Sequence, residues 1–251
     1  MGDPPPYTTV NGDEEKDSHS ADPIPIRTKI IDLTHSLISS HIPACSGHPS
    51  YTAHRSMSLS KGEFANVHTL LIGTHTGTHV DAPYHFFEDG ITVDELDLNL
   101  LTAAPAVVVD LRNKVAHERI TWEGDLRRYE ERMKEGVVVL LCTGWSKNWC
   151  KPNYSDHPFL DPGAAEKIME RGVKAIGIDA MSPDEVTEEG GDCGKVHRTV
   201  LGNSGIIIEN LNDLGRILES GIEGEGLRVS VLPLRLDKCD GSPVRAVAWA
   251  V

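Results

Sequence analysis

Eight short runs of aliphatic and β-branched residues constrain the fold of this 251-residue chain more than any other feature. Each run has the length of a β-strand, and several are apolar throughout, which is typical of strands buried on both faces. The runs cover residues 29–33, 67–72, 106–111, 137–142, 174–179, 205–209, 229–236 and 244–251. The sequence therefore predicts a protein built around a β-sheet.

Two helices are predicted between the runs in the middle of the chain. The first spans residues 121–135, with Thr121 as its N-cap and apolar residues three and four positions apart. The second spans residues 161–171, with Asp161 as its N-cap and Pro162 in the first helical position. This order of strand, helix and strand predicts crossover connections, whereas the strand-dense chain ends predict antiparallel or mixed pairing. We expect one α/β domain with a mixed sheet.

The first residues of the chain differ in composition from the rest. Residues 1–26 are rich in Pro, Asp, Glu, Ser and Gly and contain almost no large aliphatic side chains. Such a segment cannot bury enough apolar surface to offset the conformational entropy lost on ordering. We predict a disordered tail over residues 1–26 and one folded domain over residues 27–251.

The charge balance argues against two classes of partner. The chain has 24 Lys and Arg against 38 Asp and Glu, a net charge of -14, which repels nucleic acid and anionic lipid. It contains neither a signal-peptide core nor a run of about 18 apolar residues that could span a bilayer. Its five cysteines follow no regular spacing, which favours reduced thiols. We therefore expect a cytoplasmic protein that binds neither nucleic acid nor membranes.

Three histidines and one aspartate lie close together between His75 and His85. Gly77 and several β-branched residues disfavour a helix in this segment. In an extended strand, alternate residues share one face, so all four metal-binding side chains would point the same way. This shared parity is the main sequence argument for a metal site.

The spacing within such a strand favours one divalent ion bound by three side chains. Extended geometry puts the Cα atoms of His79 and Asp81 about 6.6 Å apart, close enough to bind one ion together. His75 and His79 would be roughly 13 Å apart on a flat strand, so the backbone must bend between them, and Gly77 allows this. Two nitrogens and one carboxylate oxygen leave positions for water, as catalytic sites do. The alternative is a set of surface or core histidines without a shared ligand.

Residues 75–85, HTGTHVDAPYH, resemble the signature of the cyclase family. This family includes the bacterial kynurenine formamidases and the isatin hydrolases. The resemblance extends over residues 28–251. It is also found in segments 31–35, 143–145, 177–179, 208–211, 232–234 and 240–246, and at His197, Arg198 and Leu201. It implies a swivelling β/β/α-type fold with a mixed β-sheet core. It also implies a divalent-metal hydrolase that acts on a small-molecule amide, formamide or cyclic amide, similar to an arylformamidase or isatin hydrolase.

The resemblance assigns five side chains to metal binding: His75, His79, Asp81, His197 and Glu209. In members with two ions, zinc or manganese, Asp81 bridges a first ion to a second one held by His197 and Glu209. In members with one ion, His197 and Glu209 instead handle protons or hydrogen bonds, so one or two ions remain open. The resemblance also implies that His85 lies beside a metal-bound water, which makes it a catalytic candidate together with His197 and Glu209.

The substrate and the reaction class are left open by the sequence. Formamidases of the family carry a Trp-Pro-Gly-Asp-Pro run that lines the pocket, where this chain has ACSGHP at residues 44–49. The resemblance therefore does not identify the substrate. A metal-dependent lyase, dehydratase or cyclising enzyme of secondary metabolism is one alternative, and a non-enzymatic interaction protein with a relic site is another. By analogy with the family we expect a homodimer or homotetramer that binds a small-molecule substrate.

Overall fold

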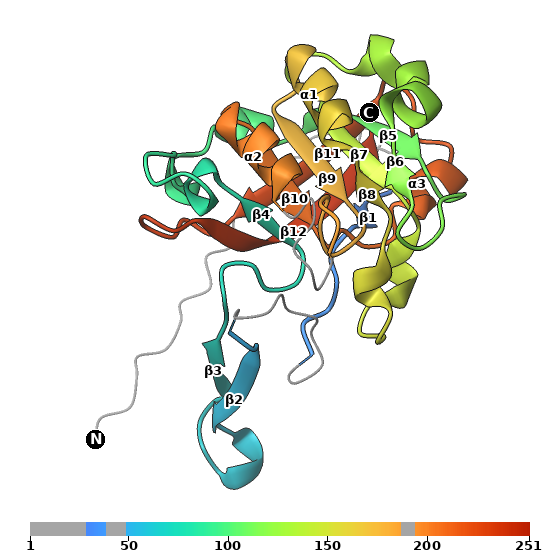
Figure 1. Cartoon of the computed structure of the whole chain (residues 1–251). Coiled ribbons are helices and arrows are strands. Elements are labelled where there is room, and N and C mark those ends of the chain that lie inside the picture. The colour runs from blue at the N-terminus through green and yellow to red at the C-terminus, as the bar shows by residue number, and fades with distance from the viewer. Residues whose placement is uncertain (1–28, 39–48, 187–193) are drawn as a thin grey trace, which may run out of the picture.

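The computed structural model of the protein describes residues 29–38, 49–186 and 194–251. The predicted tail over residues 1–26 lies outside this part of the chain, as does most of the segment 44–49. A sheet of eight strands forms the centre of the domain (Figure 1). Its strands are β1 (Ile31–Asp32), β4 (His79–Asp81), β5 (Ala104–Asp110), β7 (Val138–Cys142), β9 (Ala175–Ile178), β10 (Ile206–Glu209), β11 (Leu227–Pro233) and β12 (Gly241–Ala250).

The sheet is mixed, with the order β1-β12-β11-β5-β7-β9-β10-β4. Strands β5, β7, β9 and β10 are parallel, while β1, β4, β11 and β12 join through antiparallel pairs. Strand β4 also pairs with β12, so the two ends of the sheet meet and close it into a barrel. The predicted mixed-sheet α/β fold is confirmed, and seven of the eight predicted runs contribute strands to this sheet.

The parallel strands are buried on both faces, as their continuous apolar composition predicts. In β5, Val107 and Val109 belong to one hydrophobic cluster, and Ala106 and Val108 belong to the other. The cluster that contains Val107 and Val109 lies between the parallel strands and the helices. The cluster that contains Ala106 and Val108 lies on the other face of these strands, towards β11 and β12. Alternate side chains of one strand therefore supply both cores.

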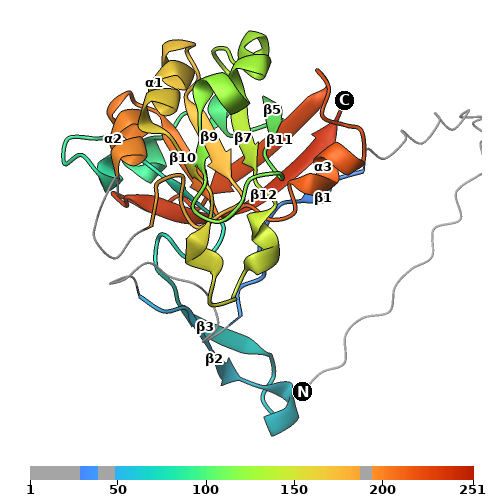
Figure 2. The same ribbon diagram turned by 45° about the vertical axis from the view of Figure 1, so that its right-hand side comes forward.

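Helices α1 (Pro162–Glu170) and α2 (Lys195–Gly202) pack side by side over the sheet (Figure 2). The predicted cap of α1 is confirmed, because the Asp161 side chain accepts a hydrogen bond from Ala164 N–H. Helix α2 and the short α3 (Gly215–Glu219) were not predicted from the sequence. In the described part of the chain, every helix is too short or too polar to cross a bilayer.

The predicted α-helix over residues 121–135 is wrong in type. The chain forms a π-helical turn, η5 (Trp122–Leu126), followed by a 3₁₀ segment, η6 (Arg127–Arg132). The Thr121 carbonyl accepts N–H groups from both Asp125 and Leu126, and the Asp125 carboxylate accepts Thr121 N–H at 2.8 Å. These local contacts widen the first turn, so the regular α-helical ladder does not start.

Two pairs of strands lie outside the central sheet. Strand β6 (Arg119–Ile120) pairs with β8 (Phe159–Leu160). The predicted run 67–72 forms β3 (Val67–Leu71), which pairs with β2 (Thr52–Met57) in a hairpin that projects from the domain (Figures 1 and 2). The remaining 3₁₀ turns are η1 (Leu59–Lys61), η2 (Pro83–His85), η3 (Val93–Glu95), η4 (Leu98–Leu100), η7 (Trp145–Asn148) and η8 (Tyr154–Asp156).

His35 follows β1 and is buried, but it belongs to none of the groups of possible metal ligands. Its ring stacks on Trp149 with 4.2 Å between the centroids. The backbone N–H of His35 donates a hydrogen bond to Thr78 Oγ1. The side chain is 7% exposed, and burial lowers its pKa to about 4. In the unfolded chain, His35 is therefore protonated as the pH falls below the ordinary histidine pKa. In the folded chain, it is protonated only at a lower pH.

This histidine makes the protein less stable in acid. His35 contributes its full stability above about pH 6.5, and the contribution is lost as the pH falls towards 4. Both proteins are expected to have a lower free energy of unfolding at pH 4.5 than at pH 7. The decrease is expected to be about 2 kcal/mol smaller in the His35→Phe variant than in the parent. Urea unfolding at the two pH values measures this difference, and equal losses in both proteins would contradict it.

Candidate metal centre

The pairing of β4 with β10 places three acidic and basic side chains together. Strand β4 pairs with β10 so that His79 is opposite Glu209, and Asp81 is opposite Ile207. His79 and Asp81 point to the same side of β4, while Val80 between them points into the hydrophobic core. The seam formed by β4 and its two neighbours, β10 and β12, therefore carries two carboxylates and an imidazole, all of them buried.

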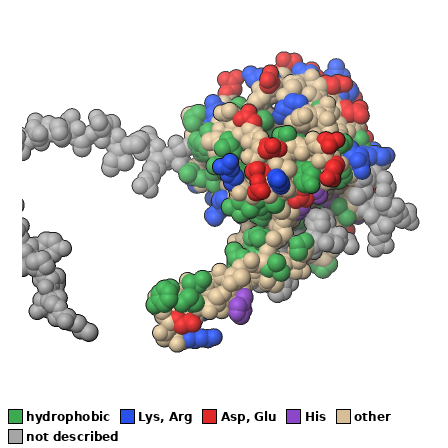
Figure 3. All heavy atoms as spheres, turned by 90° about the vertical axis from the view of Figure 1, so that its left-hand side faces the viewer, with side chains coloured by type: hydrophobic (Ala, Val, Ile, Leu, Met, Phe, Trp, Pro, Cys, Tyr) green, Lys and Arg blue, Asp and Glu red, His purple; other side chains and the backbone are tan. Residues whose placement is uncertain are grey.

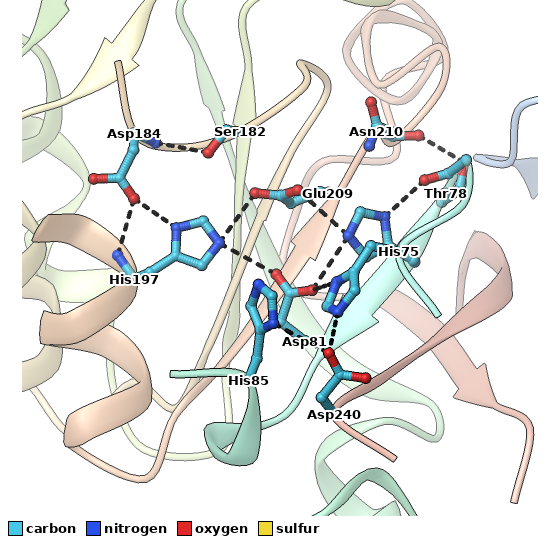
Figure 4. A network of polar contacts seen from close by, with 12 residues as sticks. His75, Thr78, Asp81, His85, Ser182, Asp184, His197, Glu209, Asn210 and Asp240 are labelled. Atoms are coloured by element: carbon cyan, nitrogen blue, oxygen red, sulfur yellow. Dashed lines mark hydrogen bonds and ion pairs between the residues drawn. The ribbon is translucent and has the colours of Figure 1, made fainter. Parts of the chain in front are cut away.

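His197 reaches the same place from the first turn of α2. Its Nε2 lies 3.5 Å from Asp81 Oδ2 and 3.3 Å from Glu209 Oε1 (Figure 4). Asp184 fixes this orientation, because its carboxylate accepts the backbone N–H of His197 at 3.0 Å and contacts the ring Nδ1 at 2.5 Å. A histidine held through its second nitrogen by a carboxylate is a common arrangement beside metal ions.

The predicted extended strand over residues 75–85 is wrong outside β4. Gly77 has a φ of +66°, so the predicted bend is present, and the bend turns the preceding residues back towards the strand. His85 lies at the end of the 3₁₀ turn η2, which Pro83 begins. The side chains of His75 and His85 still converge, with 4.0 Å between their ring centroids. A turn and a 3₁₀ segment, not strand parity, bring these two rings together.

Asp240 completes the cluster and was given no role from the sequence. Its Oδ2 lies 2.7 Å from His75 Nε2 and 3.2 Å from His85 Nδ1 (Figure 4). The other ring nitrogen of His75 contacts Asp81 Oδ1 at 2.6 Å. Asp240 precedes β12, whose first residue Gly241 pairs with Asp81, so the same seam brings it here.

The cluster contains three groups of side chains whose ligand atoms lie within 4.8 Å of one another. Two of these groups share Asp81, and the third shares His75 with the first. The groups are His75, His79 and Asp81; Asp81, His197 and Glu209; and His75, His85 and Asp240. All five side chains assigned to metal binding by the resemblance are thus brought together, and so is His85.

Three buried atoms at the centre suit a metal ion. His79 Nε2, Asp81 Oδ2 and Glu209 Oε1 have no hydrogen-bond partner in the described part of the chain. His79 Nε2 lies 3.2 Å from Asp81 Oδ1 and 3.4 Å from Glu209 Oε2. Buried polar atoms without hydrogen-bond partners are costly, and each of these three atoms belongs to a side chain of a group that could bind a cation. Imidazole nitrogens and carboxylate oxygens together form a common set of ligands for divalent metal ions.

The electrostatics of the cluster are those of a cation site. Burial opposes a charge on His79, but the Asp81 and Glu209 carboxylates outweigh it and raise its pKa to about 10. Burial likewise opposes a charge on His75, but Asp240 and Asp81 raise its pKa to about 9. In Glu209, burial and the Asp81 charge raise the pKa, but the neighbouring histidines lower it to about 2. The carboxylates therefore stay ionised and attract positive charge.

The backbone of the neighbouring strand ends supports this arrangement. Thr78 Oγ1 donates to the carbonyl of Asn210 at 2.6 Å, which ties the segment before β4 to the residue after Glu209. Asn210 itself has a φ of +54°, a conformation that asparagine tolerates better than most residues. Its side-chain Oδ1 accepts the Tyr154 hydroxyl at 2.9 Å. These contacts hold Glu209 and His79 in register.

The family model called Cyclase (Putative cyclase) matches residues 31–185, more than half of the chain. The chain belongs to the cyclase family. The family resemblance of the sequence is therefore confirmed. The matched residues include the segment 75–85 and Asp184, while His197, Glu209 and Asp240 lie beyond them.

Relatives of this cyclase-family chain carry enzyme names. A kynurenine formamidase of Geobacillus thermodenitrificans is 33% identical over 221 residues, which cover 86% of this chain and 95% of the relative. Isatin hydrolase A of Ralstonia solanacearum has a similar fold, with a TM-score of 0.76 and 23% identity over 89% of this chain and 92% of that one. A protein described as a potential metal-dependent hydrolase with cyclase activity has a TM-score of 0.70 and 25% identity, covering 89% of this chain and 98% of its own.

Proposed function

We propose that the protein is a metal-dependent hydrolase that cleaves a carbon–nitrogen bond, other than a peptide bond, in a small-molecule amide, formamide or cyclic amide. The observation that carries this proposal is the set of unpartnered buried atoms on His79, Asp81 and Glu209. The names of its relatives, kynurenine formamidase and isatin hydrolase, support the same class of bond. A relic site is disfavoured because such atoms destabilise a protein that binds nothing there.

One or two divalent ions, zinc or manganese, would be held by the side chains of the barrel seam. His75, His79 and Asp81 form one ligand group, and Asp81 is shared with His197 and Glu209 in the other. Such an ion lowers the pKa of water towards about 7 and polarises a carbonyl group. With one ion, His197 and Glu209 remain available to donate or accept hydrogen bonds to the substrate.

His85 is the proposed proton carrier. Its Nδ1 faces Asp240 at 3.2 Å, which leaves Nε2 to accept a proton from the attacking water and return it to the leaving nitrogen. Its side chain is more exposed than those of His79 and His197, as a group that meets substrate requires. Asp240 orients the ring, because a carboxylate at one imidazole nitrogen selects the tautomer with the proton on that side.

Formanilide and isatin test the proposed reaction as an open-chain and a cyclic amide. Metal-loaded protein is expected to hydrolyse at least one of them, and in ¹⁸O-labelled water each turnover places one labelled oxygen in the carboxylic product. A lyase or cyclising enzyme incorporates no solvent oxygen, so an unlabelled product would favour that alternative. Failure to turn over either amide with zinc or with manganese would contradict the proposal.

The proposed compartment is the cytoplasm. What supports it is the unpaired state of the described cysteines, Cys142, Cys150 and Cys239, which suits a reducing environment. Cys142 is the last residue of β7 and is buried, and burial raises its pKa, so it is not a reactive thiol. Small molecules, and neither nucleic acid nor membranes, are the proposed partners of the site.

A further inference from the structure

The metal centre is open to solvent on the side where His85 and Asp240 lie. Their side chains are 21% and 34% exposed, whereas those of His79 and Asp81 are 3% and 1% exposed. A substrate reaches the centre from the side on which its groups are exposed. The residues next to His85 therefore decide which small molecules the centre accepts.

Phe86 connects His85 to helix α2 on this side. Its partly buried ring makes an edge contact with the His85 ring, with 4.9 Å between the centroids, and stacks on His197 at 4.8 Å. Gly194, the N-cap of α2, permits this approach, because a Cβ at Gly194 would lie 2.9 Å from a carbon of the Phe86 ring. The ring is thus fixed against both the proposed proton carrier and a metal-binding side chain.

Arg198 lies on the same aromatic ring. It follows His197 in α2 and is exposed, and its guanidinium carbon is 5.4 Å from the centroid of Phe86. The electron-rich face of an aromatic ring attracts a guanidinium and holds it in place. Among the residues that the structure describes, this guanidinium makes no ion pair and no hydrogen bond. Its N–H donors are therefore held one aromatic ring away from His85 and have no acceptor in the described chain.

This absence of an acidic partner distinguishes Arg198 from other exposed arginines of the domain. Arg127 contacts Glu123 at 2.7 Å, and Arg245 contacts Asp32 at 2.6 Å. Figure 3 shows the side of the domain on which α2 lies, where Lys and Arg side chains are found among Asp and Glu side chains. A guanidinium that remains unpaired in a chain of net charge -14 is available to a carboxylate that comes from outside.

We propose that Arg198 is a specificity-determining residue, which binds a carboxylate group of the substrate while the amide lies at the metal centre. This inference rests on the proposed hydrolase function and narrows its substrate to amides that also carry a carboxylate. Such a group requires a cation outside the seam, because the carboxylates of the seam itself repel it. A guanidinium binds a carboxylate through two parallel N–H bonds, and its contact with Phe86 reduces the side-chain entropy lost on binding.

Formanilide and 2-formamidobenzoate test this role, because the two formamides differ by one carboxylate. The ratio of kcat/KM for 2-formamidobenzoate to that for formanilide is expected to fall about 10- to 100-fold in Arg198→Gln, the value of a lost charge-assisted hydrogen bond. The change is expected in KM more than in kcat, because the contact is present before and during the reaction. Arg198→Lys keeps the charge without the planar fork and is expected to give an intermediate ratio.

Arg216→Gln is the matched control, because Arg216 is a half-exposed arginine on α3 that pairs with Asp213. It is expected to keep the parental ratio. A parental ratio in Arg198→Gln would overturn the proposal and leave the hydrolase function in place.

Calorimetry with 2-aminobenzoate, the product of the anionic probe, separates the two proposals because it requires no turnover. The dissociation constant from the metal-loaded protein is expected to rise about 10- to 100-fold in Arg198→Gln. Equal dissociation constants in parent and variant would overturn the role of Arg198. A rise in a protein that hydrolyses neither formamide would support Arg198 as the carboxylate-binding residue and contradict the proposed hydrolysis.

Discussion

The His79→Ala variant is expected to lose its bound metal and at least about 1,000-fold in kcat/KM for amide hydrolysis, because its imidazole is at the centre of the seam. Nε2 of His79 contacts the carboxylates of Asp81 and Glu209 at 3.2 and 3.4 Å, so no other side chain replaces it. Removing a residue that merely orients a metal ligand costs about 10- to 100-fold, and removal of the ligand itself costs more.

The measurement is the metal content per chain, by elemental analysis, together with turnover of the more reactive of the two amide probes. His117→Ala serves as the control, because His117 is half exposed, its ring contacts Asp156, and it belongs to none of the three ligand groups. It is expected to keep both metal and turnover. A His79→Ala protein with parental metal content and turnover would show that the seam is not the active centre. The unfolding free energy is measured in parallel, since the change leaves buried carboxylates with one cation fewer.

The strands of the core were predictable because their composition reflects burial on both faces. The run 137–142 is apolar throughout, and the five residues of β7 within it are buried. The run 67–72 contains His68 and Thr69 among four aliphatic residues, and β3 within it is exposed in the projecting hairpin. A local pattern reports the preference for an extended backbone and for burial, but it does not report which surface provides the burial.

The site was predictable in part for a related reason. His79 and Asp81 are on one strand, so their parity was sufficient to place them together. Gly77 was correctly identified as the bend, but the turn before it and the 3₁₀ segment after β4 arise from contacts with distant residues. Leu37, for example, occupies the space that a Cβ at Gly77 would fill.

Two carboxylates, Asp184 and Asp240, were given no role from the sequence. Asp240 lies in a segment that resembles the family, but neither residue belongs to a local pattern of metal ligands. Their roles depend on pairings between residues distant in the chain, such as Gly241 with Asp81. His197 and Glu209 were identified through the family resemblance alone, because the register of β10 on β4 has no local signal.

His85→Ala separates proton transfer from metal binding. The ring contacts Asp240 and stacks near His75, but it is absent from both ligand groups that contain Asp81. We therefore expect the variant to keep its metal while kcat falls by about 100- to 10,000-fold, the usual contribution of a general base. Imidazole added to the buffer is expected to restore part of the rate, because it can enter the space that the side chain leaves.

The pH profile distinguishes this role from a structural one. A missing proton carrier removes the dependence of kcat on the protonation of one group, whereas a distorted metal site lowers kcat without changing the shape of the profile. Tyr84→Phe is the matched control, because Tyr84 is in the same 3₁₀ turn and carries no assigned role. It is expected to keep the parental rate and profile. If His85→Ala loses its metal or keeps its rate, the proposed role of His85 as proton carrier is wrong. His197 is then the next candidate, because its ring lies 5.9 Å from that of His85.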